Sequence, residues 1–173
     1  MKSRNIVLLV VYFLIFLGSQ ILIFRNVVLF NFAFCFIYVG FILLIPLEVP
    51  ILLLLSLAFF FGLSIDLFYD TMGIHAASTV LIAYMRSYII NFLTPRGGYD
   101  ASTEISIPAL GFQWFVVYAI VMIFIHHLFL FLIESWGLGV FFRMIGKTIM
   151  STLFTLFVFI LFQYLFYPSK KLN

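Results

Sequence analysis

Residues 51–92 read ILLLLSLAFFFGLSIDLFYDTMGIHAASTVLIAYMRSYIINF. The apolar runs 51–68 and 74–93 are each long enough for a helix to cross the hydrocarbon core of a bilayer, which takes about 20 residues. Asp70 and Gly73 lie in the turn between them, and glycine readily adopts the left-handed conformation that ends many helices. The stretch therefore predicts two antiparallel transmembrane helices joined by a short polar turn.

The rest of the chain has the same apolar character. Of its 173 residues, 66% are hydrophobic and only 9% are charged, whereas a soluble domain has about 25% charged residues. This composition excludes a soluble enzyme, a disordered chain and a disulfide scaffold. The single cysteine, Cys35, lies inside an apolar run, where it is expected to behave as a small buried hydrophobic residue.

Apolar runs of similar length recur along the chain and are separated by charged or proline-containing turns. We expect one integral membrane domain, residues 1–173, of the all-α polytopic class with six transmembrane helices. The expected spans are 6–24, 27–45, 51–68, 74–93, 110–133 and 148–166. The first span is interpreted as an uncleaved anchor, because no small-residue cleavage site ends it. Segment 134–147 mixes charged and apolar residues, so it either lies along the membrane surface or begins the last helix.

The distribution of basic residues predicts the orientation. Six spans place both termini on one side, and a cytoplasmic location gives the inner segments five basic residues and the outer segments three. The inner ones are Lys2, Arg4, Arg96, Lys170 and Lys171, and the outer ones are Arg25, Arg143 and Lys147. The positive-inside rule therefore favours two cytoplasmic termini. Such scattered basic residues are typical of a membrane protein and do not indicate nucleic-acid binding.

Several ionisable residues are expected in the outer half of the membrane, where an ionisable side chain is by default a functional-site hypothesis. Asp66 follows an unbroken apolar run, Asp70 lies one turn later, and His75 follows the turn. His127 is expected at a similar depth, with Glu134 further along the same helix face. We hypothesise a polar cluster of these five residues. The alternative is that both acids lie at a hydrated helix end.

Small residues follow one face of the span 74–93, and small side chains let membrane helices approach closely. The residues expected to pack helices together are Gly62, Gly73, Ala76, Thr79, Ala83 and Ser87. Arg86 lies in the same span. It is expected either to be paired or to extend toward the cytoplasmic interface.

The sequence contains none of the common catalytic motifs G-x-S-x-G, H-E-x-x-H, C-x-x-C or the phosphate-binding loop. His126 and His127 are adjacent, whereas two histidines that bind one metal from a helix are three or four residues apart. We therefore expect neither a cofactor, nor a metal site, nor enzymatic activity.

Residues 61–86 resemble the rod shape-determining membrane protein MreD family. The family pattern is a glycine, an aspartate four residues later, and a turn with Leu/Met-Gly before an alanine-rich span. The matching residues are Gly62, Asp66, Met72, Gly73, Ala76 and Ala77. Residues 93–100, residues 111–115 and Glu134 are similar to one subgroup of the family.

The resemblance implies a non-catalytic membrane scaffold of the bacterial cell-wall elongation complex, which maintains rod shape from the cytoplasmic (inner) membrane. It implies MreC, MreB, RodA and a penicillin-binding transpeptidase as partners, besides membrane lipid. It also implies a fold similar to the substrate-binding subunits of energy-coupling-factor transporters. That kinship supplies the alternative function, a small-molecule (vitamin-like) binding or transport subunit.

Overall fold

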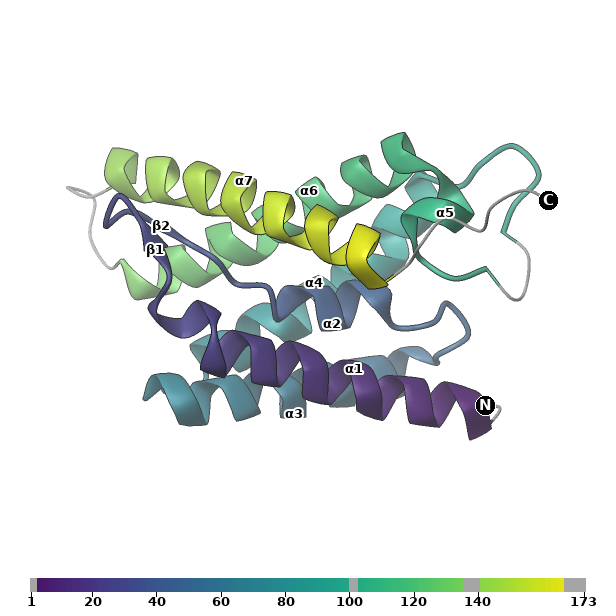
Figure 1. Cartoon of the computed structure of the whole chain (residues 1–173), viewed down its shortest axis with the longest axis horizontal. Helices are drawn as coiled ribbons and strands as arrows, with labels where there is room; N and C mark the ends of the chain where they lie inside the picture. Colours follow the sequence, from purple (N-terminus) through teal and green to yellow (C-terminus); the bar gives the residue numbers. More distant parts are fainter. Residues whose placement is uncertain (1–2, 100–102, 136–140, 167–173) are drawn as a thin grey trace.

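The computed structural model describes residues 3–99, 103–135 and 141–166. The chain is mostly helical, and its long helices lie along a shared axis (Figure 1). These helices are α1 (Ser3–Leu22), α3 (Ile51–Tyr69), α4 (Ile74–Phe92), α6 (Phe112–Glu134) and α7 (Phe141–Phe166). The shorter elements are the 3-10 helix η1 (Phe24–Asn26), the strands β1 (Val28–Leu29) and β2 (Ala33–Phe34), and the helices α2 (Val39–Leu44) and α5 (Ile107–Leu110).

Three of the helices, α3, α6 and α7, are long and apolar enough to cross a membrane. They present large apolar side chains on the outer surface of the bundle, such as Leu67, Phe142 and Leu165. Such contiguous apolar exposure is unfavourable in water and favourable in lipid. The chain is therefore a helical membrane protein.

Residues 27–45 do not form the transmembrane helix that the sequence predicts, and that prediction is wrong. They contain the antiparallel hairpin β1–β2, with Val28 opposite Phe34. An extended stretch and the short helix α2 follow it. All residues of α2 are buried. An apolar run of this kind is consistent with either a helix or a buried extended segment, and composition alone does not distinguish them.

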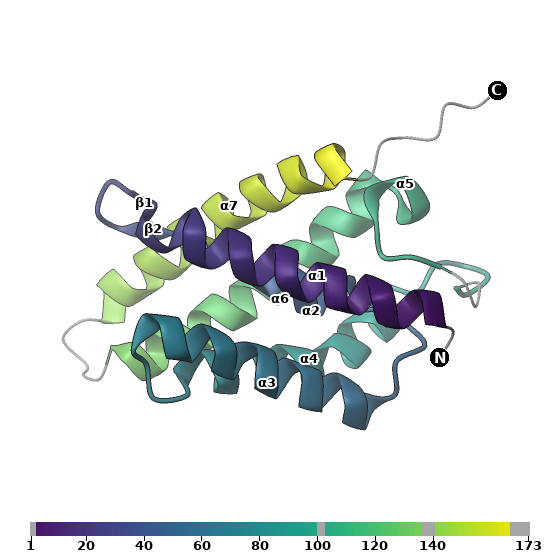
Figure 2. The same ribbon diagram turned by 60° about the horizontal axis from the view of Figure 1, so that its bottom comes forward.

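The segment 33–44 runs through the interior of the bundle. β2 contacts α7, and α2 contacts α1, α4 and α6. In Figures 1 and 2 the segments α1, 33–44, α3, α4, α6 and α7 follow the long axis in alternating directions, so that α1 begins and α7 ends toward the same end. The innermost layer of the protein is thus an extended chain and a short helix surrounded by long helices.

The mixed segment 134–147 is part of helix α7 from Phe141 onward. Its residues 136–140 lie outside the described residues, as do Lys2, Lys170 and Lys171, which contribute to the predicted orientation.

Helices α3 and α4 touch through their backbones at Gly62. A Cβ atom added there would lie 2.5 Å from the Cα of Ala76 and 2.8 Å from its backbone nitrogen. The Thr79 hydroxyl lies 2.9 Å from the carbonyl oxygen of Ala58 on α3. The turn between the helices contains Asp70 and Gly73, both with positive φ. Glycine at position 62 therefore sets the distance between α3 and α4.

We predict that Gly62→Ala destabilises the protein by about 1–3 kcal/mol, because the added methyl group forces two backbones apart. Gly18→Ala in α1 is the matched control, since a Cβ atom there meets nothing within 4 Å. It should stabilise the helix by about 0.5–1 kcal/mol, because alanine loses less backbone entropy than glycine. Unfolding in detergent measures both, and equal stability of the two variants would contradict the close contact.

Candidate functional site

Asp66 joins α3 to α4. Its side chain is only 2% exposed and accepts hydrogen bonds from the backbone N–H groups of His75 (3.0 Å) and Ala76 (2.9 Å). It also accepts one from the Thr71 hydroxyl. The first N–H groups of a helix have no partner within the helix, and a carboxylate there also interacts favourably with the helix dipole. Asp66 therefore caps the start of α4 from the preceding helix.

Tyr38 lies between two histidines in the interior. Its hydroxyl oxygen is 2.7 Å from His75 Nδ1 and 2.7 Å from His126 Nε2. The hydroxyl has one proton, so it donates to one histidine and accepts from the other. His126 Nδ1 is buried without a hydrogen-bond partner among the described residues, and an unpaired buried donor is costly. We assign the proton of His126 to Nε2, so that His126 donates to Tyr38 and Tyr38 donates to His75.

Helix α7 provides acceptors for the extended segment beside it. Phe34 N–H donates to Ser151 Oγ (2.9 Å), and Phe36 N–H donates to Thr155 Oγ1 (3.0 Å). Thr155 Oγ1 is also 3.2 Å from His127 Nε2, while His127 Nδ1 lies 2.7 Å from its own helix carbonyl at Ile123. His127 therefore carries its proton on Nδ1 and accepts a hydrogen bond from Thr155.

Gln20 of helix α1 forms hydrogen bonds with the next part of the same segment, and it is fully buried. Its Oε1 accepts from Tyr38 N–H at 3.3 Å, and its Nε2 donates to the Cys35 carbonyl at 3.2 Å. Its Nε2 also donates to the Tyr69 hydroxyl at 2.6 Å. One amide side chain thus satisfies a backbone donor and a backbone acceptor and connects the segment to the end of α3.

Arg86 forms hydrogen bonds at the C-terminal end of the interior segment. Its guanidinium donates through Nη2 to the carbonyl oxygen of Ile45 and through Nε to the Tyr118 hydroxyl at 3.2 Å. Tyr118 in turn donates to the carbonyl oxygen of Leu43 at 3.2 Å. Leu43 lies in the last turn of α2 and Ile45 directly follows it, where carbonyl groups have no partner within the helix. Arg86 is buried and paired with them, so it does not extend to the interface.

The structure brings together part of the hypothesised polar cluster. Asp66 bonds the backbone of His75, and the ring of Phe36 separates His75 from His127, with centroid distances of 5.6 and 5.3 Å. Asp70 is exposed at the end of α3. Glu134 forms a separate ion pair with Lys147 at 2.7 Å. The cluster thus contains Asp66, His75 and His127, and the two other acids lie apart from it.

Of the six residues expected to pack helices together, four are buried and two are not. Gly62, Ala76, Thr79 and Ala83 are buried. Gly73 lies in the turn with open space around it, and Ser87 is exposed.

Sequence reasoning missed most of the polar interior, namely Gln20, Tyr38, His126, Ser151, Thr155 and the Arg86–Tyr118 contact. Ser151 and Thr155 carry the one clear signal, because they are four residues apart on an otherwise apolar helix and so share a face. Their face is the one that contacts the extended segment.

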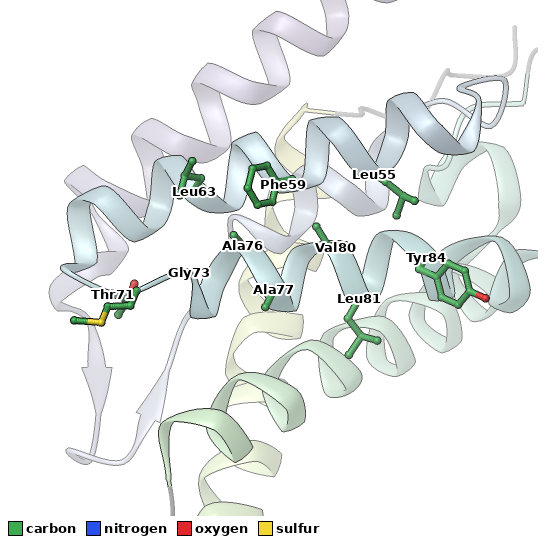
Figure 3. Close-up of a pocket in the computed structure, with 11 residues that line it drawn as sticks. Leu55, Phe59, Leu63, Thr71, Gly73, Ala76, Ala77, Val80, Leu81 and Tyr84 are labelled. Atoms are coloured by element: carbon green, nitrogen blue, oxygen red, sulfur yellow. The ribbon is translucent and has the colours of Figure 1, made fainter.

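The buried polar side chains described above form hydrogen bonds with other parts of the chain. The described residues contain no group of three or more His, Cys, Asp or Glu side chains that could hold a metal ion. A groove of about 820 Å³ lies on the outer side of α3 and α4 and is lined mainly by apolar side chains such as Leu55, Phe59, Val80 and Leu81 (Figure 3). The buried polar side chains of this site therefore hold the chain together.

Thr155→Val is predicted to destabilise the protein by about 2 kcal/mol, because it leaves Phe36 N–H and His127 Nε2 without their partner. Thr152→Val is the matched control on the same helix. Its hydroxyl is buried without a partner among the described residues, so the change should be neutral or stabilising by roughly 0.5 kcal/mol. Chemical unfolding in detergent compares them, and a Thr155→Val variant as stable as Thr152→Val would contradict the assignment.

Asp66→Asn is predicted to cost about 1–2 kcal/mol, because the amide keeps one acceptor oxygen but loses the charge at the start of α4. Asp66→Ala removes all the acceptors and should cost about 3 kcal/mol. Asp70→Asn makes the same chemical change at an exposed position and should stay within about 0.5 kcal/mol. Thermal unfolding tests this order, and equal effects at positions 66 and 70 would show that Asp66 is only a hydrated helix end.

Comparison of the chain with family models, curated proteins and solved structures finds no match.

Proposed function

We propose that the protein is a non-catalytic scaffold of the MreD type in the bacterial cytoplasmic membrane, where it supports cell-wall elongation and rod shape. The sequence resemblance over residues 61–86 suggests this function. The observation that carries it is that the residues of the family pattern are those that join α3 to α4. Gly62 permits the backbone contact with Ala76, and Asp66 caps α4. A pattern with structural tasks suits a protein that acts by presenting surfaces to partners.

The proposal includes six membrane crossings with both termini in the cytoplasm. The crossings are α1, the segment 33–44, α3, α4, α6 and α7. Non-helical backbone is tolerated at membrane depth when protein groups satisfy its hydrogen bonds, which is the arrangement around residues 34–38. The excess of basic residues on the proposed inner side supports the orientation. A fold like that of energy-coupling-factor substrate-binding subunits belongs to the same proposal.

The proposed partners follow from the resemblance. They are MreC, the cytoplasmic filament protein MreB, RodA and a penicillin-binding transpeptidase. The apolar outer surface of α3, α6 and α7 offers area for contacts within the membrane. The alternative of a small-molecule binding subunit requires free polar groups facing a cavity. In the described interior, Asp66, Gln20 and Tyr38 are instead bonded to other parts of the chain.

Co-purification from native membranes of a rod-shaped bacterium tests the function. The tagged chain should retain MreC and wall-synthesis proteins, and it should preserve rod shape when it replaces the cell's own MreD protein. Gly62→Leu should lose both properties, because the α3–α4 contact has no room for a side chain. Gly18→Leu should keep both. Capture of an ATP-binding cassette module without MreC would contradict the scaffold and favour the transport alternative.

A further inference from the structure

The groove on the outer side of α3 and α4 is open to the surroundings of the bundle (Figure 3). Its volume is about 820 Å³, and its walls include Phe59 and Leu63 of α3 and Val80 and Leu81 of α4. Phe59 and Leu63 are 46% and 38% exposed. Because α3 is long and apolar enough to cross a membrane, these side chains face the hydrocarbon of the bilayer.

The groove extends over part of the membrane thickness. From the turn between the two helices, its lining residues extend as far as Tyr84 on α4 and Leu55 on α3. At 1.5 Å per residue these lengths are about 15 Å from Ile74 to Tyr84 and about 21 Å from Leu55 to Tyr69. The hydrocarbon core is about 30 Å thick, so the groove begins at one membrane surface and ends inside the core. This depth fits the acyl chain of a lipid in that leaflet, whereas a membrane-crossing helix of another protein would extend beyond the groove.

An exposed carboxylate lies at the surface end of the groove. Asp70 directly precedes Thr71, Met72 and Gly73, which line the groove. In the part of the chain that the structure describes, no Lys or Arg forms an ion pair with Asp70. Arg25 lies over the ring of Tyr69, with its guanidinium carbon 5.7 Å from the ring centroid. The negative charge at this end therefore favours a cationic headgroup and disfavours an anionic one.

We propose that the groove binds one acyl chain of a phospholipid whose headgroup carries an ammonium group, as phosphatidylethanolamine does, and that this ammonium group pairs with Asp70. The apolar walls accept the chain, and an ammonium group donates charge-assisted hydrogen bonds to a carboxylate. The lipid would cover the outer side of the contact between α3 and α4. The site does not depend on the proposed scaffold function.

The test uses the purified full chain, freed of lipid in a non-ionic detergent. Dioleoyl phosphatidylethanolamine and dioleoyl phosphatidylglycerol are titrated separately, and the rise of Tm gives a dissociation constant for each lipid. Phosphatidylethanolamine should bind saturably and about fivefold more tightly, because its ammonium group gains an ion pair and the anionic lipid is repelled. Equal or tighter binding of phosphatidylglycerol, or no saturable rise with either lipid, would overturn the proposal.

A charge variant tests the role of Asp70. Asp70→Asn keeps the size of the side chain and suits the positive φ of this position, but it removes the charge. The ratio of the two dissociation constants should fall from about five to about one. Glu104→Gln removes an exposed carboxylate from a segment that does not line the groove, and it should keep the ratio. An unchanged ratio in Asp70→Asn, or its loss in Glu104→Gln, contradicts the pairing.

A second pair of variants tests the groove itself. Ala77 lines the groove and is exposed, so Ala77→Phe fills the space and should abolish the saturable rise of Tm with both lipids. Ser56→Phe places the same ring at an exposed position of α3 outside the groove, and it should keep the rise. An Ala77→Phe variant that binds lipid like the unmodified protein refutes the site. If Ala77→Phe does not fold, the ratio in Asp70→Asn decides.

Discussion

An extended stretch of backbone inside a membrane protein must find its hydrogen-bond partners within the protein. Residues 34–38 meet this requirement with side chains from two helices, since Ser151 and Thr155 accept from the segment on one side and Gln20 bonds it on the other. Residues 35–38 are buried in the protein, so each unsatisfied N–H or carbonyl there would cost about 1–3 kcal/mol. The positions of α1 and α7 are thus coupled to the path of the segment between them.

The same principle explains Asp66 and Arg86, the charged residues in the interior of the described part of the chain. Asp66 satisfies the N–H groups that begin α4, and Arg86 satisfies a carbonyl that follows α2. Both residues therefore complete the backbone bonding of a neighbouring element. This arrangement leaves the outer helix faces free for other molecules, which is consistent with the proposed scaffold.

The sequence predicts the long helices well, because the length of an apolar run is nearly sufficient to identify a helix that crosses a bilayer. It predicts Asp66 because a charge inside such a run is conspicuous. It fails at residues 27–45, where the side chains from Cys35 to Ile45 are buried in protein and the run carries no periodicity that distinguishes strand from helix. Tyr38 and Gln20 were missed for a related reason, since their importance depends on contacts with segments distant in the chain. Glu134 was placed in the wrong group because helical spacing does not reveal its ion pair with Lys147.

Amide hydrogen exchange of residues 34–38 in a lipid nanodisc tests the central claim most directly. The amides of Phe34, Phe36 and Tyr38 each donate to a side chain of α7 or α1. They should exchange as slowly as the buried amides of α3 and α6, although they belong to no helix, because exchange requires these bonds to open. Rapid exchange at these three amides, with slow exchange in the surrounding helices, would contradict the account.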